Sequence, residues 1–166
     1  CTCTPDMFFP SVACLVQSAV GATNAACMDI SAACSGFIYG LATAKSYIES
    51  GMAKNALVVG VDTLSKITNW TDRSTCVLFG DGAGAAVISL SDDDSGILSI
   101  VLRSDGSKGG ILTVPAGGTR LPVDEEILKK KLNTIQMDGP EVYKLAVTKM
   151  VEASQEALEI AGKKTS

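Results

Sequence analysis

The chain has 166 residues, of which 46% are hydrophobic and 19% charged, and its formal net charge is −4. A chain of this length can bury a sizeable core, but so apolar a composition indicates that part of its apolar surface faces something else. The acidic balance and the lack of a basic cluster argue against nucleic acid as a partner. No apolar run approaches the ~20 residues of a membrane-spanning helix, and no signal peptide opens the chain, so we expect a cytoplasmic protein without a membrane partner.

Six cysteines are spread along the sequence. A disulfide framework is typical of short secreted proteins, whereas alternating helix and strand patterns favour a cytosolic protein with reduced thiols. A zinc site is not expected, because the chain has no C-x-x-C pair and no histidine.

The first predicted elements are the end of a strand at residues 1–4 and a helix at residues 11–20. Apolar residues at helical spacing define this helix, with Ser11 as its N-cap and Gly21 at its end. Phe8 and Phe9 stand just before it, and hydrophobic packing beneath the start of the helix is the simplest explanation for the pair.

Cys34 lies between a strand-like run at residues 25–30 and a helical apolar pattern. The members of that pattern are Phe37, Leu41, Ala44 and Ile48. At a helix N-terminus, free backbone N–H groups and the helix dipole favour an anion, and therefore the thiolate form of a thiol. Cys34 is thus a candidate nucleophile. An inert buried cysteine and a phosphate-binding turn between strand and helix stay open as alternatives.

The helix after Cys34 is predicted to end at Gly51, and residues 56–61 form an apolar run typical of a strand buried in a parallel sheet. Strand, helix and strand together indicate a βαβ unit. Gly36, Gly40 and Ala44 recur every four residues within the helix. They form a flat face that another backbone can approach closely.

The next stretch is polar, and residues 62–75 predict a surface loop in which Asp72 and Arg73 form a local ion pair. Residues 80–85 contain glycines that resemble a dinucleotide-binding fingerprint. Such a loop leads into a helix, whereas residues 85–90 predict a strand. We therefore expect these glycines to serve tight turns and close backbone approach.

In the last third of the chain, residues 92–94 predict a solvated turn, and residues 97–102 and 111–114 predict paired strands. Residues 115–131 are polar and include a charged helical segment. An amphipathic helix follows from near Asp138, with Pro140 in its first turn, to Gly162.

Four stretches together resemble one protein family. They are FFPS at residues 8–11, DISAACSGF at residues 29–37, WTDRSTCVLFGDGAGA at residues 70–85 and MDGPEV at residues 137–142. In this order and at these separations they resemble the motifs of β-ketoacyl-acyl-carrier-protein synthase III, a condensing enzyme of type II fatty-acid synthesis with the thiolase fold.

The resemblance covers nearly the whole chain and implies an α/β protein with a thiolase-like fold. In the complete enzyme this fold is layered αβαβα, and the chain would be its middle part. Residues 1–90 would belong to the N-terminal half, which carries the nucleophile, and residues 91–166 would begin the C-terminal half.

The resemblance also implies roles for single residues. Cys34 would take a short acyl group from coenzyme A as a thioester, Arg73 would stack on the adenine of coenzyme A, and Phe9 would reach into the partner's acyl pocket across a homodimer interface. The other implied substrate-binding residues are Leu64, Leu78, Phe79, Met137 and Gly139. Acyl-coenzyme A and acyl carrier protein are the implied partners, and no cofactor beyond the coenzyme A substrate is implied.

Members of this family also use a histidine and an asparagine from segments nearer the C-terminus. This chain has no histidine, so we expect these 166 residues alone to be incomplete for condensation. A non-catalytic acyl or nucleotide binding module, and a structural fragment that folds only with a missing partner segment, stay open as alternatives.

Overall fold

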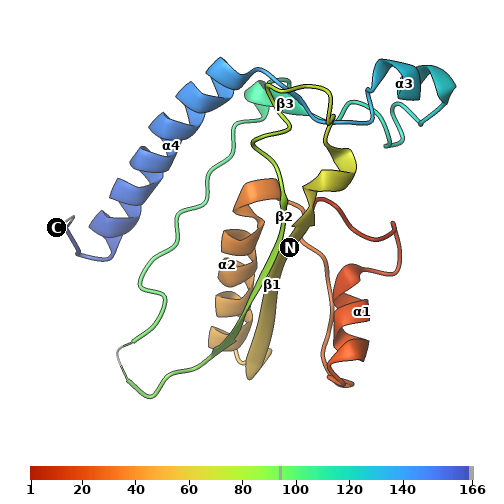
Figure 1. Cartoon of the computed structure of the whole chain (residues 1–166). Coiled ribbons are helices and arrows are strands. Elements are labelled where there is room, and N and C mark those ends of the chain that lie inside the picture. The colour runs from red at the N-terminus through yellow and green to blue at the C-terminus, as the bar shows by residue number, and fades with distance from the viewer. Residues whose placement is uncertain (94, 165–166) are drawn as a thin grey trace. The chain divides into compact units, whose positions relative to one another are not determined.

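The computed structural model of the chain describes all residues except 94, 165 and 166 (Figure 1). The chain contains both helices and strands and divides into two compact units. Unit 1 comprises residues 1–63 and 81–96, and unit 2 comprises residues 64–80 and 97 onward. These units are defined by contacts within the chain. The predicted boundary at residue 90 instead separates the two halves of a complete thiolase-like enzyme, and it stays a prediction.

Unit 1 has two helices whose ends match their sequence signals. Helix α1, Val12–Ala19, has Ser11 as its N-cap, and the Ser11 hydroxyl accepts the Cys14 N–H at 3.3 Å. Helix α2, Gly36–Glu49, ends before Gly51, where φ is 74°, a backbone conformation that glycine commonly supplies at helix ends. Both helices predicted for this part of the chain are confirmed.

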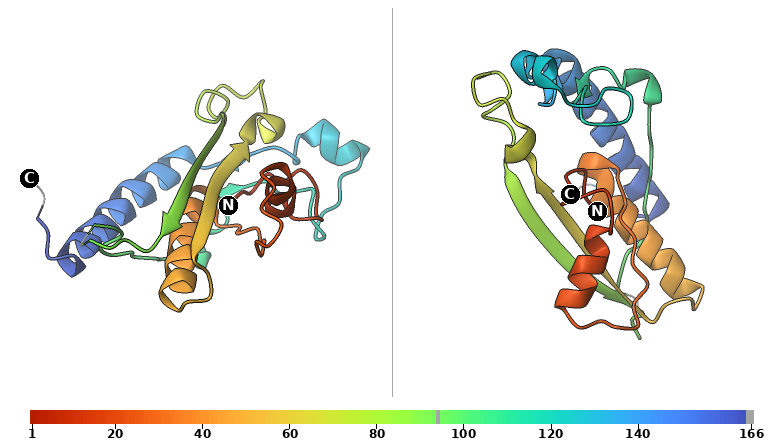
Figure 2. Two further views of the ribbon diagram at one scale, coloured as in Figure 1. Left: turned by 90° about the horizontal axis from the view of Figure 1, so that it is seen from below. Right: turned by 90° about the vertical axis from the view of Figure 1, so that its right-hand side faces the viewer.

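The strands of unit 1 form an antiparallel pair. β1, Asn55–Thr63, faces β2, Asp81–Ser89, with Gly60 opposite Gly84, and both strands are seen beside α2 in Figure 2. The predicted strand at residues 56–61 is confirmed, but its burial in a parallel sheet is wrong, because within β1 only Val58 is buried. One side of β1 contacts α2, and the strand paired with it in the described chain, β2, runs in the opposite direction.

Residues 25–30 carry no strand, so the described chain does not form the predicted βαβ unit. A β-ladder needs successive backbone bonds, and this segment receives one from the N-terminal residues, from the Thr2 N–H to the Ile30 carbonyl oxygen at 3.1 Å. The strand end predicted at residues 1–4 is not formed as a strand either. Cys1 nevertheless makes two backbone bonds to β1, with Val59 and Val61.

The glycine-rich stretch at residues 80–85 runs into the start of β2 and not into a helix, which agrees with the rejection of a dinucleotide loop. Gly82 and Gly84 are strand residues, and nothing lies within 4 Å of where their Cβ atoms would be. The tight turns and close backbone approach expected for these two glycines are therefore wrong within the described chain. The strand expected at residues 85–90 is present and begins earlier, at Asp81.

The solvated turn predicted at residues 92–94 includes Asp94, which lies outside the described residues. Its neighbour Asp93 is exposed and accepts hydrogen bonds from Ser91 Oγ at 2.6 Å and from the Ser95 N–H at 2.9 Å. The side-chain bonds from Ser91 and Ser95 lower the pKa of Asp93 to about 2. Local hydroxyl and amide donors therefore satisfy this carboxylate.

The flat face predicted in α2 is the buried face of that helix. Its buried residues are Gly36, Gly40, Ala44 and Ile48. A Cβ at Gly40 would lie 2.6 Å from Cys1 Sγ and 2.7 Å from Val58 Cγ1, which leaves no room for a side chain. Helix α2 therefore approaches β1 and the N-terminal residue as closely as it does because position 40 has no side chain.

Unit 2 contains short elements and one long helix. They are 3₁₀ turns at Leu64–Ile67 and Gly106–Lys108, strands β3 (Leu112–Thr113) and β4 (Gln136–Met137), and helices α3 (Glu125–Lys130) and α4 (Gly139–Ile160). Helix α3 is the charged helical segment expected within residues 115–131. Its N-cap Asp124 accepts the Ile127 N–H at 2.8 Å, and Ile127 is buried together with Ala116 and Ile135.

The pairing predicted for residues 97–102 with residues 111–114 is wrong. β3 pairs instead with β4, Leu112 opposite Met137, and residues 97–102 carry no strand. This segment lies against α4, where Ser99 Oγ donates to the Ala157 carbonyl oxygen at 2.7 Å, and the following Arg103 pairs with Glu156. Contacts with a helix thus replace the expected ladder.

Helix α4 begins after its N-cap Asp138 and has Pro140 in its first turn, as predicted. Its apolar stripe is covered only in part: Val142 is half-buried, whereas Met150 is 68% exposed and Ile160 is 62% exposed. Although α4 has 22 residues, neither it nor any other helix in the described part of the chain is long and apolar enough to cross a membrane.

We expect Gly40→Ala to lower the free energy of unfolding by about 1–2 kcal/mol. An added methyl group overpacks the contact with Cys1 and Val58, and this cost exceeds the helix preference of alanine over glycine, up to about 1 kcal/mol. Urea unfolding measures the change. Gly110→Ala, where nothing lies within 4 Å of the added atom, is the matched control and should shift stability by less than about 0.5 kcal/mol. Equal stabilities of the two variants would contradict the tight contact.

Candidate active site

Two contacts in unit 1 hold the segment that leads to Cys34. The Asp29 carboxylate accepts the N–H groups of Val12 at 2.8 Å and Ala13 at 2.9 Å, which are free donors in the first turn of α1. The next residue, Ile30, accepts the Thr2 N–H through its carbonyl oxygen. The chain thus reaches Cys34 from a segment anchored to α1 and to the N-terminal residues.

Cys34 is the middle residue of a 3₁₀ turn, Ala33–Ser35, that continues directly into α2, and it is exposed. Ala33, the residue before it, has a φ of 44°, in the left-handed region that residues with a Cβ rarely adopt. Such strain occurs preferentially at functional sites, where surrounding contacts hold it in place. Here it directs the chain sharply from the approaching segment into the helix.

The start of α2 is open to an anion. Its N-cap, Ser35, makes no side-chain capping bond, and its first turn contains no acidic residue. No side-chain oxygen therefore counters the positive end of the helix dipole here, while the N–H groups of Ser35 and Gly36 donate to the carbonyl oxygens of Ala32 and Ala33 in the preceding 3₁₀ turn. The predicted location of Cys34 at a helix N-terminus is confirmed.

Asp62 on β1 is a polar residue of unit 1 that the sequence had placed only at the start of a loop. Its Oδ1 accepts the Cys3 N–H at 2.8 Å, the Cys3 thiol at 3.3 Å, and the hydroxyls of Thr2 and Thr4, both at 3.0 Å. Burial alone would raise the pKa of Asp62, but these hydrogen bonds outweigh it and hold the pKa below its ordinary value. No local motif could have identified it, because its partners lie far away in sequence.

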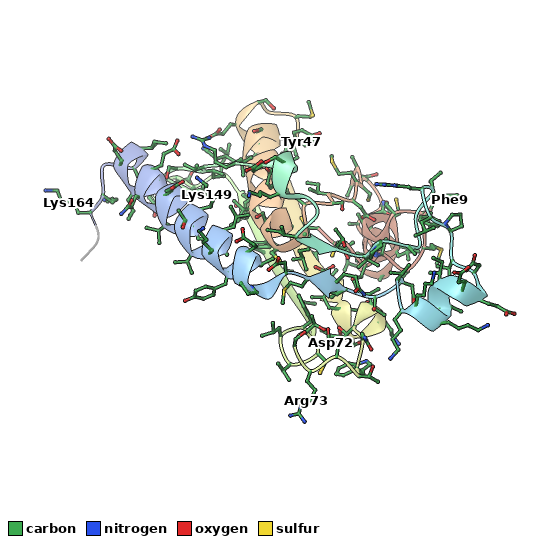
Figure 3. All side chains as sticks on the ribbon, turned by 90° about the horizontal axis from the view of Figure 1, so that it is seen from above. Phe9, Tyr47, Asp72, Arg73, Lys149 and Lys164 are labelled. Atoms are coloured by element: carbon green, nitrogen blue, oxygen red, sulfur yellow. The ribbon has the colours of Figure 1, made fainter. Side chains whose placement is uncertain are left out.

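In unit 2, Asp72 organises the loop at residues 68–80. Its carboxylate accepts the Ser74 N–H at 3.0 Å, the Ser74 hydroxyl at 2.7 Å and the hydroxyl of the buried Thr75 at 2.9 Å. The bonds from Ser74, followed by that from Thr75, lower the pKa of Asp72. Within the described chain Asp72 makes no ion pair with Arg73, so that expectation is wrong. Arg73 is exposed and extends outward from the loop in Figure 3.

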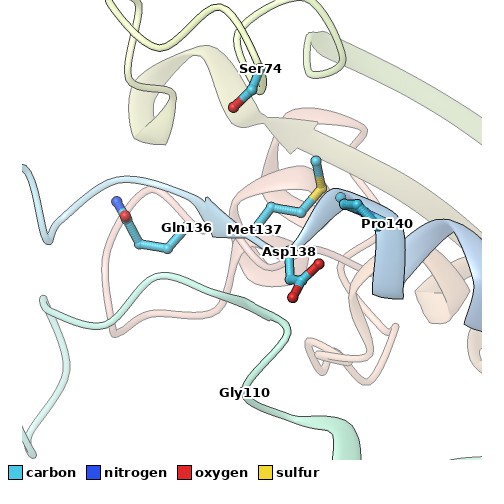
Figure 4. Close-up of a pocket in the computed structure, with 7 residues that line it drawn as sticks. Ser74, Gly110, Gln136, Met137, Asp138 and Pro140 are labelled. Carbon is cyan, nitrogen blue, oxygen red and sulfur yellow. The ribbon is translucent and has the colours of Figure 1, made fainter.

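A cavity of about 770 Å³ in unit 2 brings two of the predicted substrate-binding residues together (Figure 4). Its lining residues are Ser74, Gly110, Gln136, Met137, Asp138, Gly139 and Pro140. Met137 and Gly139 had been identified by resemblance, whereas Ser74 had not, although it directly follows Arg73. The Asp138 N–H donates to the Ile111 carbonyl oxygen at 2.8 Å, which fixes the chain at the start of α4.

The other predicted site residues line neither this cavity nor a second one, in unit 1. Phe9 is 83% exposed and lies in unit 1. In unit 2, Leu64 begins a 3₁₀ turn, Leu78 is 61% exposed and Phe79 is half-buried. The second cavity, about 390 Å³, is in unit 1, and it is lined by Phe37, Gly60, Gly84 and Ala85. The predicted roles of Phe9, Leu64, Leu78 and Phe79 stay predictions.

Comparison with known proteins gives consistent matches. The family model for 3-oxoacyl-[acyl-carrier-protein (ACP)] synthase III matches residues 28–106, which include both Cys34 and Arg73. The beta-ketoacyl-[acyl-carrier-protein] synthase III of Caldanaerobacter subterraneus is 56% identical over 161 residues, covering 97% of this chain and 49% of that protein. The protein of the same name from Clostridioides difficile is 54% identical over 165 residues, which cover 99% of this chain and 50% of that protein. The chain spans about half the length of the curated relatives it matches.

Solved structures agree. The 3-oxoacyl-[acyl-carrier-protein] synthase III of Aquifex aeolicus matches with a TM-score of 0.84 and 47% identity, covering 98% of this chain and 48% of that one. The enzyme from Thermus thermophilus matches with a TM-score of 0.85 and 41% identity, covering 98% and 49%. The chain therefore has the α/β architecture of the thiolase-like fold. Within that class, the chain is similar over nearly its whole length to proteins named 3-oxoacyl-[acyl-carrier-protein] synthase III.

We expect Ala33→Gly to stabilise the chain by about 0.5–1 kcal/mol, because glycine adopts a φ of 44° without the steric cost of a Cβ. Ala32→Gly, at a residue with a φ of −142°, is the neighbouring control and should destabilise. Urea unfolding of both variants measures the difference. If Ala33→Gly were as destabilising as Ala32→Gly, the turn before Cys34 would not be strained.

Proposed function

We propose that this chain is part of an acyltransferase that initiates fatty-acid synthesis. The enzyme would condense a short acyl-coenzyme A with malonyl-acyl-carrier-protein through a thioester on Cys34. The observation that carries the proposal is the position of Cys34, exposed at the uncapped start of α2. It occurs within a sequence 56% identical over 161 residues to a protein named beta-ketoacyl-[acyl-carrier-protein] synthase III.

The first step would use groups that unit 1 provides. The Cys34 thiolate attacks the carbonyl carbon of the acyl-coenzyme A, a new carbon–sulfur bond forms to Cys34, and the bond to the coenzyme A sulfur breaks. The departing thiolate takes up the proton that Cys34 has lost. The backbone N–H groups at the start of α2 favour the anionic thiol before the attack, which is the activation that a cysteine nucleophile needs.

In the second step, loss of carbon dioxide from the malonyl group leaves a carbanion, which attacks the thioester carbon and releases Cys34. Stabilising the charge in this step needs donors aimed at a developing oxyanion. The chain has no histidine, so we propose that the condensing step depends on residues beyond these 166.

Unit 2 would contribute to the binding of coenzyme A. The cavity at Ser74, Met137 and Gly139 has the size of a small-molecule site. Arg73, next to Ser74, has no ion-pair partner within the described chain and so keeps its planar guanidinium available for an aromatic base. We assign Arg73 to the adenine and the cavity to a neighbouring part of the same substrate.

The homodimer and the cytoplasmic location are also part of this proposal. Phe9 is 83% exposed, and an exposed aromatic side chain is suited to a partner's acyl pocket. The six free thiols support the proposed cytoplasmic location, because a reducing compartment keeps cysteines unpaired.

We expect Cys34→Ser to abolish acylation by labelled acetyl-coenzyme A, because a serine hydroxyl at the same place stays protonated near neutral pH. Mass spectrometry of the intact chain and of its peptides locates the label. Cys14→Ser and Cys76→Ser are the controls and should keep full labelling. Label that persists in Cys34→Ser on another cysteine would contradict the assignment. A chain that binds acetyl-coenzyme A but carries no label would be a binding module.

We expect Arg73→Ala to weaken coenzyme A binding by about 1–2 kcal/mol, the scale of a desolvated cation–π stack. Titration calorimetry with coenzyme A measures this. Arg120→Ala removes another exposed arginine that has no ion pair in the described chain, and it should leave the affinity unchanged. An equal loss in both variants would indicate a general effect of positive charge instead of stacking.

A further inference from the structure

A second thiol, that of Cys3, is hydrogen-bonded to Asp62 of β1, the strand that helix α2 approaches at Val58 and Gly60. The Cys1 N–H donates to the Val59 carbonyl oxygen, and the Val61 N–H donates to the Cys1 carbonyl oxygen. These two bonds to the residues on either side of Gly60 are the pattern of a parallel strand pair in which Cys1 is opposite Gly60. Cys3, two residues further, is therefore level with Asp62, as its two bonds to the Asp62 carboxylate require.

Helix α2 runs past β1 in the opposite direction. A Cβ at Gly40 would meet Val58, and the Phe37 side chain lies 3.2 Å from where a Cβ of Gly60 would be. Continuing this series, the next β1 residue on the same face is Asp62. The next residues toward the N-terminus of α2 are those of the 3₁₀ turn that contains Cys34. The Cys3 thiol donates to the Asp62 carboxylate at 3.3 Å and therefore lies at this level of β1, while Cys1, two residues before it, packs against Gly36.

The state of the Cys3 thiol agrees with this placement. Burial of the sulfur, the hydrogen bond to Asp62, the negative charge of Asp62 and, as the smallest of these contributions, the nearby Cys34 together raise the pKa of Cys3 to about 11. The residue nevertheless keeps an exposed side. Cys3 is therefore an accessible thiol within electrostatic reach of Cys34, held in the unreactive protonated form.

A second reactive thiol at this place would interfere with thioester chemistry. A Cys3 thiolate would attack the carbonyl carbon of a Cys34 thioester, forming a bond to Cys3 sulfur and breaking the bond to Cys34, which leaves as the thiolate. We propose that Asp62 prevents this transfer by holding the Cys3 thiol in a hydrogen bond, so that the acyl group stays on Cys34. Asp62 is thus a positioning residue that selects one thiol of two, an inference that rests on the proposed function.

The test compares iodoacetamide alkylation of the full chain and of Asp62→Asn across a pH series. Cleavage before aspartate separates Cys3, in peptide 1–5, from Cys34, in a peptide that begins at Asp29, and fragmentation of peptide 1–5 distinguishes Cys1 from Cys3. A raised pKa keeps Cys3 protonated to high pH, so removing the charge should move its reaction to lower pH. We expect Cys3 to react about three- to tenfold faster near pH 8, since a larger thiolate fraction is offset in part by weaker nucleophilicity.

Two comparisons make the result decisive. Thr4→Val removes one tie between the N-terminal segment and Asp62 but keeps the carboxylate, so Cys3 should stay slow. An unchanged Cys3 profile in Asp62→Asn would overturn the proposal, as would equal acceleration in Thr4→Val, because loosening of the segment would then explain the effect. Labelling of Cys34 by acetyl-coenzyme A in the unaltered chain is the separate readout of the proposed function, and its absence leaves the Cys3 comparison intact.

Discussion

The close approach of α2 to β1 is the constraint on which the candidate site in unit 1 depends. This approach is possible because Gly40 has no side chain. A Cβ atom at this position would lie within 3 Å of Cys1 Sγ and of Val58 Cγ1. The helix is rigid over the single turn from Gly40 to Gly36, so the position of the contact sets the position of the 3₁₀ turn that carries Cys34. A packing contact inside the unit thereby determines where a thiol meets solvent.

Carboxylates act in both units as organisers of loops and helix starts more than as partners of basic side chains. Asp29 accepts two N–H groups at the start of α1, Asp124 and Asp138 cap helices in unit 2, and Asp72 closes a turn through Ser74 and Thr75. The ion pairs of the described residues lie at the surface, at least partly exposed, and each contributes little to stability. The specific geometry around Cys34 and around the cavity therefore depends on local hydrogen bonds, which salt does not screen as it screens surface ion pairs.

Helix positions could be predicted from sequence because their signals are local: Ser11 and Asp138 cap the helices they precede, and Gly51 follows α2 with the expected positive φ. The strand predictions failed at residues 25–30 and 97–102, where the composition is strand-like but no partner forms a ladder. A strand exists only with its neighbour, and the neighbour is not encoded locally. The same reason explains why Cys34 could be identified and Asp62 could not. The role of Cys34 depends on the helix that directly follows it in sequence. The role of Asp62 depends on residues 2–4, which are far from it in sequence.

The order of the units along the chain has a consequence for how the protein can be divided. The 17 residues 64–80 connect β1 to β2 but belong to unit 2. This excursion therefore interrupts unit 1 in the sequence. That excursion is fastened to unit 2 by the bond from the Ile135 N–H to the Ile67 carbonyl oxygen and by the Lys131 side chain on Asn69. No single cut therefore releases either unit whole. If residues 64–80 lost these attachments, they would become a free loop between β1 and β2, whose closure carries an entropic cost that grows only slowly with length. The hairpin would keep its register while the loop lost the order that positions Asp72 and Arg73.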